Sequence, residues 1–146
     1  MRLYLDNCCL NRPFDDPAQA RILLEAQAVV SIIQCCETGT WELVSSTTLQ
    51  FEAAQTQVGP RKMFLAGTLA LAVECVALND TIAARAQDLE HRGFQSIDAL
   101  HLASAEEVGA DCFCTCDDKL LRLAARQQDL KTRVLSPVEA IQEFSQ

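Results

Sequence analysis

Four carboxylates in this sequence stand where a strand is expected to give way to a helix, or within the first turns of a helix. They are Asp6, Glu52, Asp98 and Asp117. In an open α/β sheet, ligands bind in the crevice beyond the carboxyl ends of the strands, so acids from distant segments can meet there. Carboxylates held close together repel one another, and a bound divalent cation is the usual way to keep them ionised. The pattern therefore predicts a metal site.

Each of these acids also has an ordinary structural explanation when it is taken alone. Asp6 and Asp117 could be helix N-caps, which is the commonest use of aspartate at such positions. Glu52 could be a solvated acid on a helix surface. Asp98 is the strongest single candidate, because it lies at the start of an apolar run and a buried carboxylate is costly without a partner or an opening. The functional prediction therefore depends on the four residues together.

Strand and helix signals alternate along the chain, which predicts a three-layer α/β/α fold with a central, mainly parallel sheet. Strands are expected over 2–5, 41–45, 111–116 and 131–135, with 74–78 either a short strand or a connector, and a loop is expected over 7–16. In the first half of the chain, helices are expected from an Asp16 cap to Gly39, from a capping box at Thr47 to the break at Gly59, and over 61–71. In the second half, helices are expected from an Asn79 or Asp80 cap to Gly93, from a Ser96 cap to Gly109, over 119–127, and onward from a Ser136 capping box.

Length and composition indicate one domain over 1–146. The chain has 146 residues, of which 49% are apolar, and this is enough for a buried core. No stretch is long and apolar enough to cross a bilayer, so no membrane association is expected. The segment Met1–Leu5 lacks the charged leader and long apolar run of a secretory signal. A cytoplasmic protein is expected.

The charge balance limits the ways in which this chain could bind nucleic acid. A formal net charge of −8 argues against a broad basic face that coats DNA or RNA. A nuclease remains possible, because acids that hold a metal add to the negative total while the ion restores positive potential locally. Arg12 in the loop after Asp6, and Lys119, Arg122 and Arg126 on one helix face, could contact phosphates. A solvated helix face explains the second group equally well.

The eight cysteines do not form a recognisable metal or disulfide pattern. There is no pair of CxxC motifs, and with only two histidines the usual mixed zinc patterns cannot be written. We expect reduced thiols that act as small apolar side chains, with a metal or redox role as the alternative.

The order of four motifs resembles the PIN-domain family of metal-dependent ribonucleases, which includes the VapC-type toxins of toxin–antitoxin pairs. The motifs are Tyr4–Asn7, Thr48–Glu52, Asp98–Ala103 and Thr115–Asp118. Each motif is common alone, but their order and spacing together are more specific and extend over nearly the whole chain. The resemblance implies a PIN-like three-layer fold in a single domain.

The resemblance also implies a function. It makes Asp6, Glu52, Asp98 and Asp117 the catalytic acids, with Asp6, Asp98 and Asp117 as ligands of Mg²⁺ or Mn²⁺. Hard cations of this kind take oxygen ligands, and they can activate water to attack a phosphodiester in line. The expected activity is hydrolysis of RNA by the toxin of a toxin–antitoxin module, and the expected protein partners are a small antitoxin and a second copy of the chain.

Several neighbouring residues are candidates for substrate binding. Asn7 and Thr115 are small polar groups suited to holding a water or an acid side chain, although turn hydrogen bonds are equally compatible. His101 lies one helical turn from Asp98 and could touch a phosphate, and a satisfied core histidine is the alternative. Asp118 ranks second to Asp117. The full predicted substrate set is Asn7, Arg12, His101, Thr115, Lys119 and Arg122.

The sequence departs from many family members just after the first acid, where Cys8 and Cys9 replace the expected hydroxyl or amide residue. The departure removes no predicted ligand, but it leaves open whether this position helps to order water.

Other functions fit the same residues less well. A phosphotransferase of the haloacid-dehalogenase type needs a second aspartate two residues after Asp6, and Cys8 occupies that position. A receiver-type domain needs its phosphoacceptor at the end of a middle strand and a lysine at a later strand exit, and neither is clear. A PIN-like module that binds nucleic acid or protein without cleavage is the main alternative, and the presence of all four acids argues against it.

Overall fold

The computed structural model describes residues 1–145, which form a single parallel sheet with helices on both faces. The sheet has the strand order β3-β2-β1-β4-β5, with every neighbouring pair parallel. Its strands are β1 (Arg2–Leu5), β2 (Glu42–Ser46), β3 (Glu74–Val76), β4 (Cys112–Cys114) and β5 (Arg133–Leu135). The expected α/β/α fold class is confirmed.

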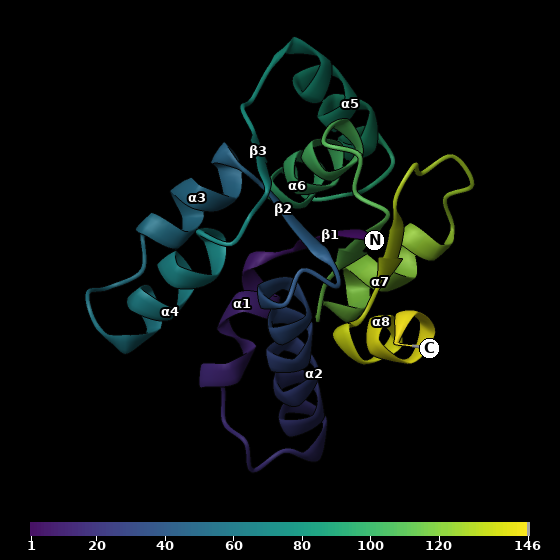
Figure 1. The fold of residues 1–146 in the computed structure, drawn as a ribbon. Helices are drawn as coiled ribbons and strands as arrows, with labels where there is room; N and C mark the ends of the chain where they lie inside the picture. The colour runs from purple at the N-terminus through teal and green to yellow at the C-terminus, as the bar shows by residue number, and fades with distance from the viewer. Residues whose placement is uncertain (146) are drawn as a thin grey trace.

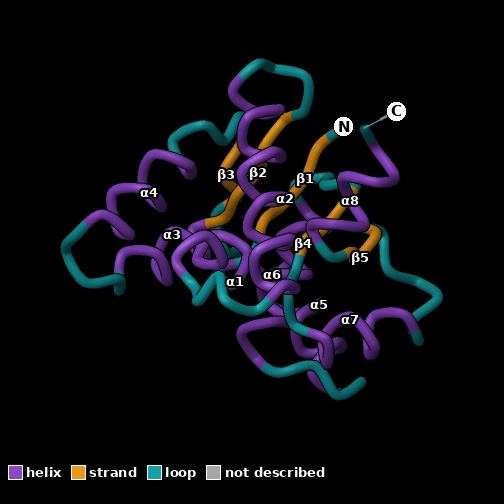
Figure 2. Tube along the Cα trace, turned by 90° about the horizontal axis from the view of Figure 1, so that it is seen from below, coloured by secondary structure: helices purple, strands orange, loops and turns teal. Residues whose placement is uncertain are grey.

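Helices connect each strand to the next. They are α1 (Asn7–Asn11), α2 (Ala20–Glu37), α3 (Thr47–Ala54), α4 (Pro60–Leu69), α5 (Asp80–His91), α6 (Ser96–Glu107), α7 (Asp118–Ala125) and α8 (Pro137–Phe144), with a 3₁₀ turn over Arg12–Phe14. Figures 1 and 2 show the sheet between the pair α2 and α8 and the pair α5 and α6. The helices α3 and α4 form a hairpin beside the sheet.

The strand order places a topological switch point at β1. The chain moves from β1 outward through β2 to β3, and then crosses back to β4 on the opposite side of β1. Leu5 pairs with Cys114, so β1 and β4 end at the same level. Open α/β sheets bind ligands at such a point, beyond the carboxyl ends of the strands.

The core surrounds β1, which is buried on both faces as a central parallel strand should be. Leu3, Tyr4 and Leu5 are each at most 1% exposed. The Tyr4 ring stacks on Phe113 of β4, with ring centroids 5.3 Å apart. The end of β1, from which Asp6 follows, is therefore held rigidly by packing.

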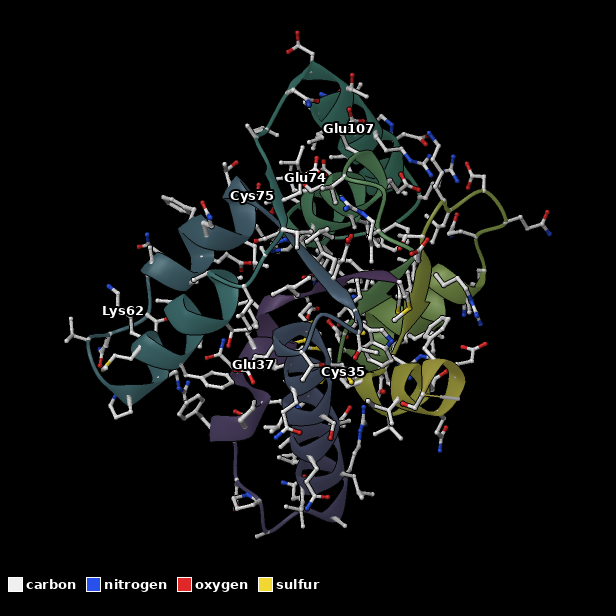
Figure 3. The ribbon with its side chains drawn as sticks, in the orientation of Figure 1. Cys35, Glu37, Lys62, Glu74, Cys75 and Glu107 are labelled. Carbon is white, nitrogen blue, oxygen red and sulfur yellow. The ribbon has the colours of Figure 1, made fainter. Side chains whose placement is uncertain are left out.

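At the opposite end of the strands, Arg2 ties β1 to its neighbours. Its guanidinium donates to Glu42 of β2 at 3.0 Å and to Glu74 of the edge strand β3 at 2.7 Å. Figure 3 shows Glu74 and Cys75 on that edge strand.

The prediction of a loop over 7–16 is wrong, because this segment contains α1 and a 3₁₀ turn. Asp6 starts α1 at once, since its Oδ1 accepts a hydrogen bond from the Cys9 amide at 3.0 Å. Pro13 fits the first turn of the 3₁₀ helix, where a missing N–H costs nothing. This first helix is too short and too polar to show a helical repeat in the sequence.

Three of the expected helix caps are also shifted. Asp16 is not the N-cap of α2, which begins at Ala20; its carboxylate instead accepts a hydrogen bond from the Ala18 amide in the preceding turn. Ser46, rather than Thr47, caps α3. Ser96 is the first residue of α6 and not its cap. In contrast, the Asn79 cap of α5 and the Ser136 capping box of α8 are confirmed.

All eight cysteines are free thiols, as expected, and Cys112 and Cys114 are fully buried in β4. Within residues 1–145, no helix is both long and apolar enough to cross a membrane.

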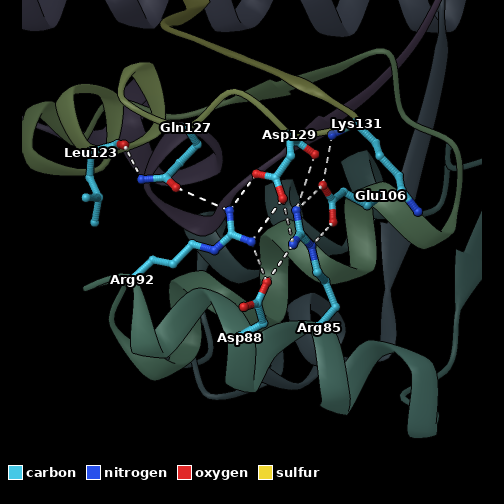
Figure 4. A network of polar contacts seen from close by, with 8 residues as sticks. All are labelled: Arg85, Asp88, Arg92, Glu106, Leu123, Gln127, Asp129 and Lys131. Carbon is cyan, nitrogen blue, oxygen red and sulfur yellow. Dashed lines mark hydrogen bonds and ion pairs between the residues drawn. The ribbon is translucent and has the colours of Figure 1, made fainter.

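A network of charges joins α5 and α6 to the loop before β5 (Figure 4). The Glu106 side chain is 4% exposed, and its carboxylate accepts bonds from Arg85 at 2.7 and 3.2 Å and from the Lys131 amide at 2.9 Å. Asp129 in turn pairs with Arg92 and with Arg85. The loop is thus fixed by one nearly buried carboxylate.

We predict that Glu106→Ala lowers the free energy of unfolding by about 3 kcal/mol, because it leaves Arg85 Nε and the Lys131 amide without the nearly buried carboxylate that is their acceptor. Chemical denaturation measures the loss. Glu107→Ala is the matched control, because Glu107 is exposed on the same helix (Figure 3), and it should change stability by less than about 0.5 kcal/mol. Equal losses in the two variants would contradict this role of Glu106.

Candidate active site

The four predicted acids line one cleft at the carboxyl ends of β1 and β4. The cleft has a volume of about 240 Å³, and its walls also include Asn7, Cys8 and His101. The acids come from four separate segments: the ends of β1 and β4, the helix α3 and the first turn of α6. The structure therefore brings together Asp6, Glu52, Asp98 and Asp117 at the topological switch point of the sheet.

Asp6 and Asp117 are helix N-caps, which is the ordinary structural role expected for each of them when it is taken alone. Asp6 Oδ1 accepts from the Cys9 amide, and Asp117 Oδ1 accepts from the amides of Lys119 at 2.9 Å and Leu120 at 3.3 Å. In both residues the capping bonds use Oδ1 and leave Oδ2 outside the cap. The capping bonds fix the carboxylates in place, so a cap and a ligand role are compatible.

The carboxylates of this cleft lack cationic partners. Within residues 1–145, no lysine or arginine forms a salt bridge with Asp6, Asp98 or Asp117. Burial raises the pKa of Asp6, which is 6% exposed. Burial and the negative charge of Asp117 raise the pKa of half-buried Asp98. The site thus holds negative charge that a cation would stabilise.

Glu52 is held by a chain of hydrogen bonds that runs into the core. Its Oε1 contacts His101 Nε2, and His101 Nδ1 lies 2.6 Å from the Tyr4 hydroxyl. Tyr4 is also 2.6 Å from Ser46 Oγ. Every bond is satisfied when Ser46 donates to Tyr4, Tyr4 donates to Nδ1, and Nε2–H donates to Glu52. Because these partners are buried, they fix the position of Glu52 at the mouth of the cleft.

His101 therefore has the surroundings of a satisfied core histidine. It is 3% exposed, and both ring nitrogens are occupied. Its predicted contact with a substrate phosphate stays a prediction, and its visible role is to position Glu52.

The other predicted polar residues divide into two groups. Asn7 lines the cleft. Thr115 is fully buried, where its hydroxyl accepts from the Asp117 amide at 3.1 Å and lies 3.4 Å from the Cys8 sulfur. Lys119 is exposed at the start of α7 and lines a small hollow with Asp98 and Asp117.

The arginines that were predicted to contact substrate lie outside the cleft. The Arg12 side chain is 17% exposed and pairs with Asp15 at 3.1 Å and with buried Glu25 at 3.6 Å. Arg122 is exposed on α7, as is Arg126 after its end. The second-ranked acid, Asp118, forms two bonds of 2.7 Å with Arg21.

Sequence reasoning missed two parts of the site. Cys8 lines the cleft, and its thiol donates to Asp6 Oδ1 at 2.8 Å. A second cavity of about 650 Å³ adjoins the cleft at Glu52 and Asn7 and extends to Arg61 at the turn between α3 and α4. The break at Gly59, just before Arg61, was the only sequence signal near it.

The spacing of the donor atoms bears on which ions could bind. Among residues 1–145, no three acidic side chains have carboxylate oxygens that all lie within 4.8 Å of one another. The only three possible ligands within that distance among these residues are the thiols of Cys8, Cys9 and Cys116. Magnesium fits an acidic site of this looser kind, because it keeps several waters and uses only one or two direct carboxylates.

Comparison with known proteins identifies the fold and the family. A search of solved structures finds the crystal structure of VapBC2 from Rickettsia felis bound to a DNA fragment from their promoter, with a TM-score of 0.57 and 12% identity over 92% of this chain and 97% of that chain. No curated protein sequence gives a significant match. The family model for the PIN domain matches residues 3–126, which include all four acids. The chain therefore belongs to the PIN domain family.

Proposed function

We propose that this chain is a Mg²⁺- or Mn²⁺-dependent endoribonuclease and the toxin of a toxin–antitoxin module. The observation that carries the proposal is the cleft at the switch point, in which Asp6, Asp98 and Asp117 meet without a basic partner among the described residues. Membership of the PIN family and the structural likeness to a VapBC complex support it.

The donor set fits a hard divalent cation. Carboxylate oxygens are the ligands that Mg²⁺ and Mn²⁺ prefer. The raised pKa values of Asp6 and Asp98 reflect negative charge that is buried or crowded, and a cation held by Asp6, Asp98 and Asp117 would relieve it. When bound, such an ion supplies Lewis-acid stabilisation of the phosphate and lowers the pKa of water.

The protein side chains supply positioning and proton transfer. Glu52 Oε1 contacts His101, and Glu52 Oε2 is the oxygen that can accept a proton from the attacking water. Lys119, exposed beside Asp98 and Asp117, is placed to contact a phosphate, and Arg61 can do so in the adjoining cavity. This short basic path suits RNA better than a broad face would in a chain of net charge −8.

The hairpin of α3 and α4 is the proposed contact surface for protein partners. It exposes Phe51, Val58 and Met63, whose side chains are 69%, 93% and 76% exposed. Large apolar side chains that remain this exposed become buried when a partner covers them, which favours this hairpin as a contact surface. A small antitoxin bound here would lie beside the cavity at Arg61, and a second copy of the chain is the other proposed partner. The proposed place of action is the cytoplasm.

RNA cleavage tests the proposed activity. We expect the purified protein to cleave single-stranded RNA when Mg²⁺ or Mn²⁺ is present and to stop when the ion is chelated. Asp117→Asn should lower the rate by on the order of 100-fold, because it removes an acid from the cleft. The neighbouring Asp118→Asn is the matched control and should retain cleavage, because Asp118 pairs with Arg21 outside the cleft.

The outcome can go against the proposal in two ways. Equal cleavage by Asp117→Asn and wild type would point to a contaminating nuclease or a different centre. Absence of cleavage together with no thermal stabilisation by Mg²⁺ or Mn²⁺ would favour a PIN-like module that binds without cleaving.

The electrostatics of Asp98 give a prediction about stability. Its pKa is raised in the folded protein, so folding becomes less favourable as pH rises from the ordinary value of 3.8 through the raised value. Asn does not titrate. In the absence of divalent ions, Asp98→Asn should therefore gain melting temperature relative to wild type as the buffer changes from acidic to neutral. Added Mg²⁺ should raise the melting temperature of wild type more than that of the variant. A pH-independent difference, or equal stabilisation by Mg²⁺, would refute the electrostatic interpretation.

A further inference from the structure

Behind the acidic cleft, the structure gathers three thiols that the proposed reaction does not use. Cys8 and Cys9 lie in α1, and Cys116 follows β4. The sulfur atoms of all three lie within 4.8 Å of one another, and those of Cys9 and Cys116 are 3.7 Å apart. More than a hundred residues separate these segments in the chain, so the trio is produced by the fold.

The sulfur spacing matches a site for a thiophilic metal ion. Zinc–sulfur bonds of about 2.3 Å in a tetrahedral site place the sulfur atoms about 3.8 Å apart, close to the separation of Cys9 and Cys116. The Cys8 sulfur lies within 4.8 Å of both of the other sulfur atoms. Soft thiolate ligands select ions such as Zn²⁺ over Mg²⁺, so this site and the acidic cleft would prefer different metals.

Hydrogen bonds and a positive charge surround these three thiols, as is usual around thiolates that bind a metal ion. The Cys116 amide donates to Cys8 Sγ at 3.2 Å, and Thr115 Oγ1 lies 3.4 Å from the same sulfur. The Arg12 guanidinium lies beside Cys116 and can balance the negative charge of a thiolate. Hydrogen bonds of this kind orient metal ligands and tune their charge.

Cys8 provides the route by which an ion could enter. Cys9 and Cys116 are 0% and 4% exposed, whereas Cys8 is half-buried and lines the acidic cleft. An ion in the cleft would therefore meet the Cys8 sulfur first and reach the two deeper sulfurs through it.

We propose that Cys8, Cys9 and Cys116 form a binding site for a thiophilic ion of the Zn²⁺ type, which is distinct from the acidic metal site and adjoins it at Cys8, a residue that lines the cleft. Binding replaces the thiol protons, which are released to solvent, and forms three metal–sulfur bonds. It also removes the proton that Cys8 donates to Asp6 Oδ1, so occupancy of this site changes the hydrogen bonding of one cleft acid.

Cobalt can be used to test the site, because Co²⁺ bound to thiolates gives a charge-transfer absorption that Zn²⁺ abolishes when it displaces cobalt. The reduced full-length protein should develop this band to saturation at one equivalent of Co²⁺ and lose it on addition of Zn²⁺. Cys8→Ser should weaken cobalt binding by at least about tenfold. Cys8 is the first choice for substitution because it is only half-buried and the variant should fold.

Two controls separate this site from the others. Cys75→Ser should keep the band, because Cys75 is exposed on the edge strand β3 (Figure 3). Asp98→Asn should also keep it, so the result does not depend on the proposed nuclease activity. In wild type, Zn²⁺ should protect Cys8, Cys9 and Cys116 from alkylation, which mass spectrometry of the peptides can locate even if a variant does not fold.

The proposal is overturned if no cobalt band forms, if Cys8→Ser binds cobalt as wild type does, or if Zn²⁺ protects other cysteines instead of this trio. Conversion of Cys9 and Cys116 to a disulfide by mild peroxide, with no cobalt band from the reduced protein, would assign the trio a redox role and would also overturn it.

Discussion

The fold holds several carboxylates close together at the switch point of a parallel sheet, although their negative charges repel one another. The ends of β1 and β4 lie at one level, so the residues that follow them must share a small volume. In this chain those residues are Asp6 and Asp117, and α6 adds Asp98 to the same cleft. Packing of the buried central strand sustains the arrangement, because β1 cannot shift without disrupting the core around it.

The same features that shape the fold also prepare the site. The capping bonds of Asp6 and Asp117 start α1 and α7, and they fix two carboxylates without using their second oxygens. The buried chain from Ser46 through Tyr4 and His101 does the same for Glu52. Arg12, which follows Asp6 closely in the sequence, pairs with Asp15 and Glu25 and not with the acids of the cleft. The carboxylates of the cleft are therefore held in place by the structure, and their negative charge remains open to stabilisation by a cation.

The sequence allowed the order of strands and helices and the meeting of the four acids to be predicted, because an aspartate after a buried strand and an acid in an apolar helix are local signals. Features that depend on distant partners were not predictable. The 3.7 Å approach of Cys9 to Cys116 and the pairing of Arg12 with Glu25 arise only when α1, α2 and the end of β4 pack together. The short α1 was missed because one aspartate cap, rather than a periodic pattern, starts it.

Electron paramagnetic resonance of Mn²⁺ measures whether the acidic cleft captures a hard divalent cation, since the signal of the free ion falls as the ion binds. We expect saturable binding to the wild-type protein, competition by Mg²⁺, and clear weakening in Asp98→Asn, with no change in Cys75→Ser. Binding that is absent, or that is equally strong in wild type and Asp98→Asn, would show that the cleft does not hold the ion.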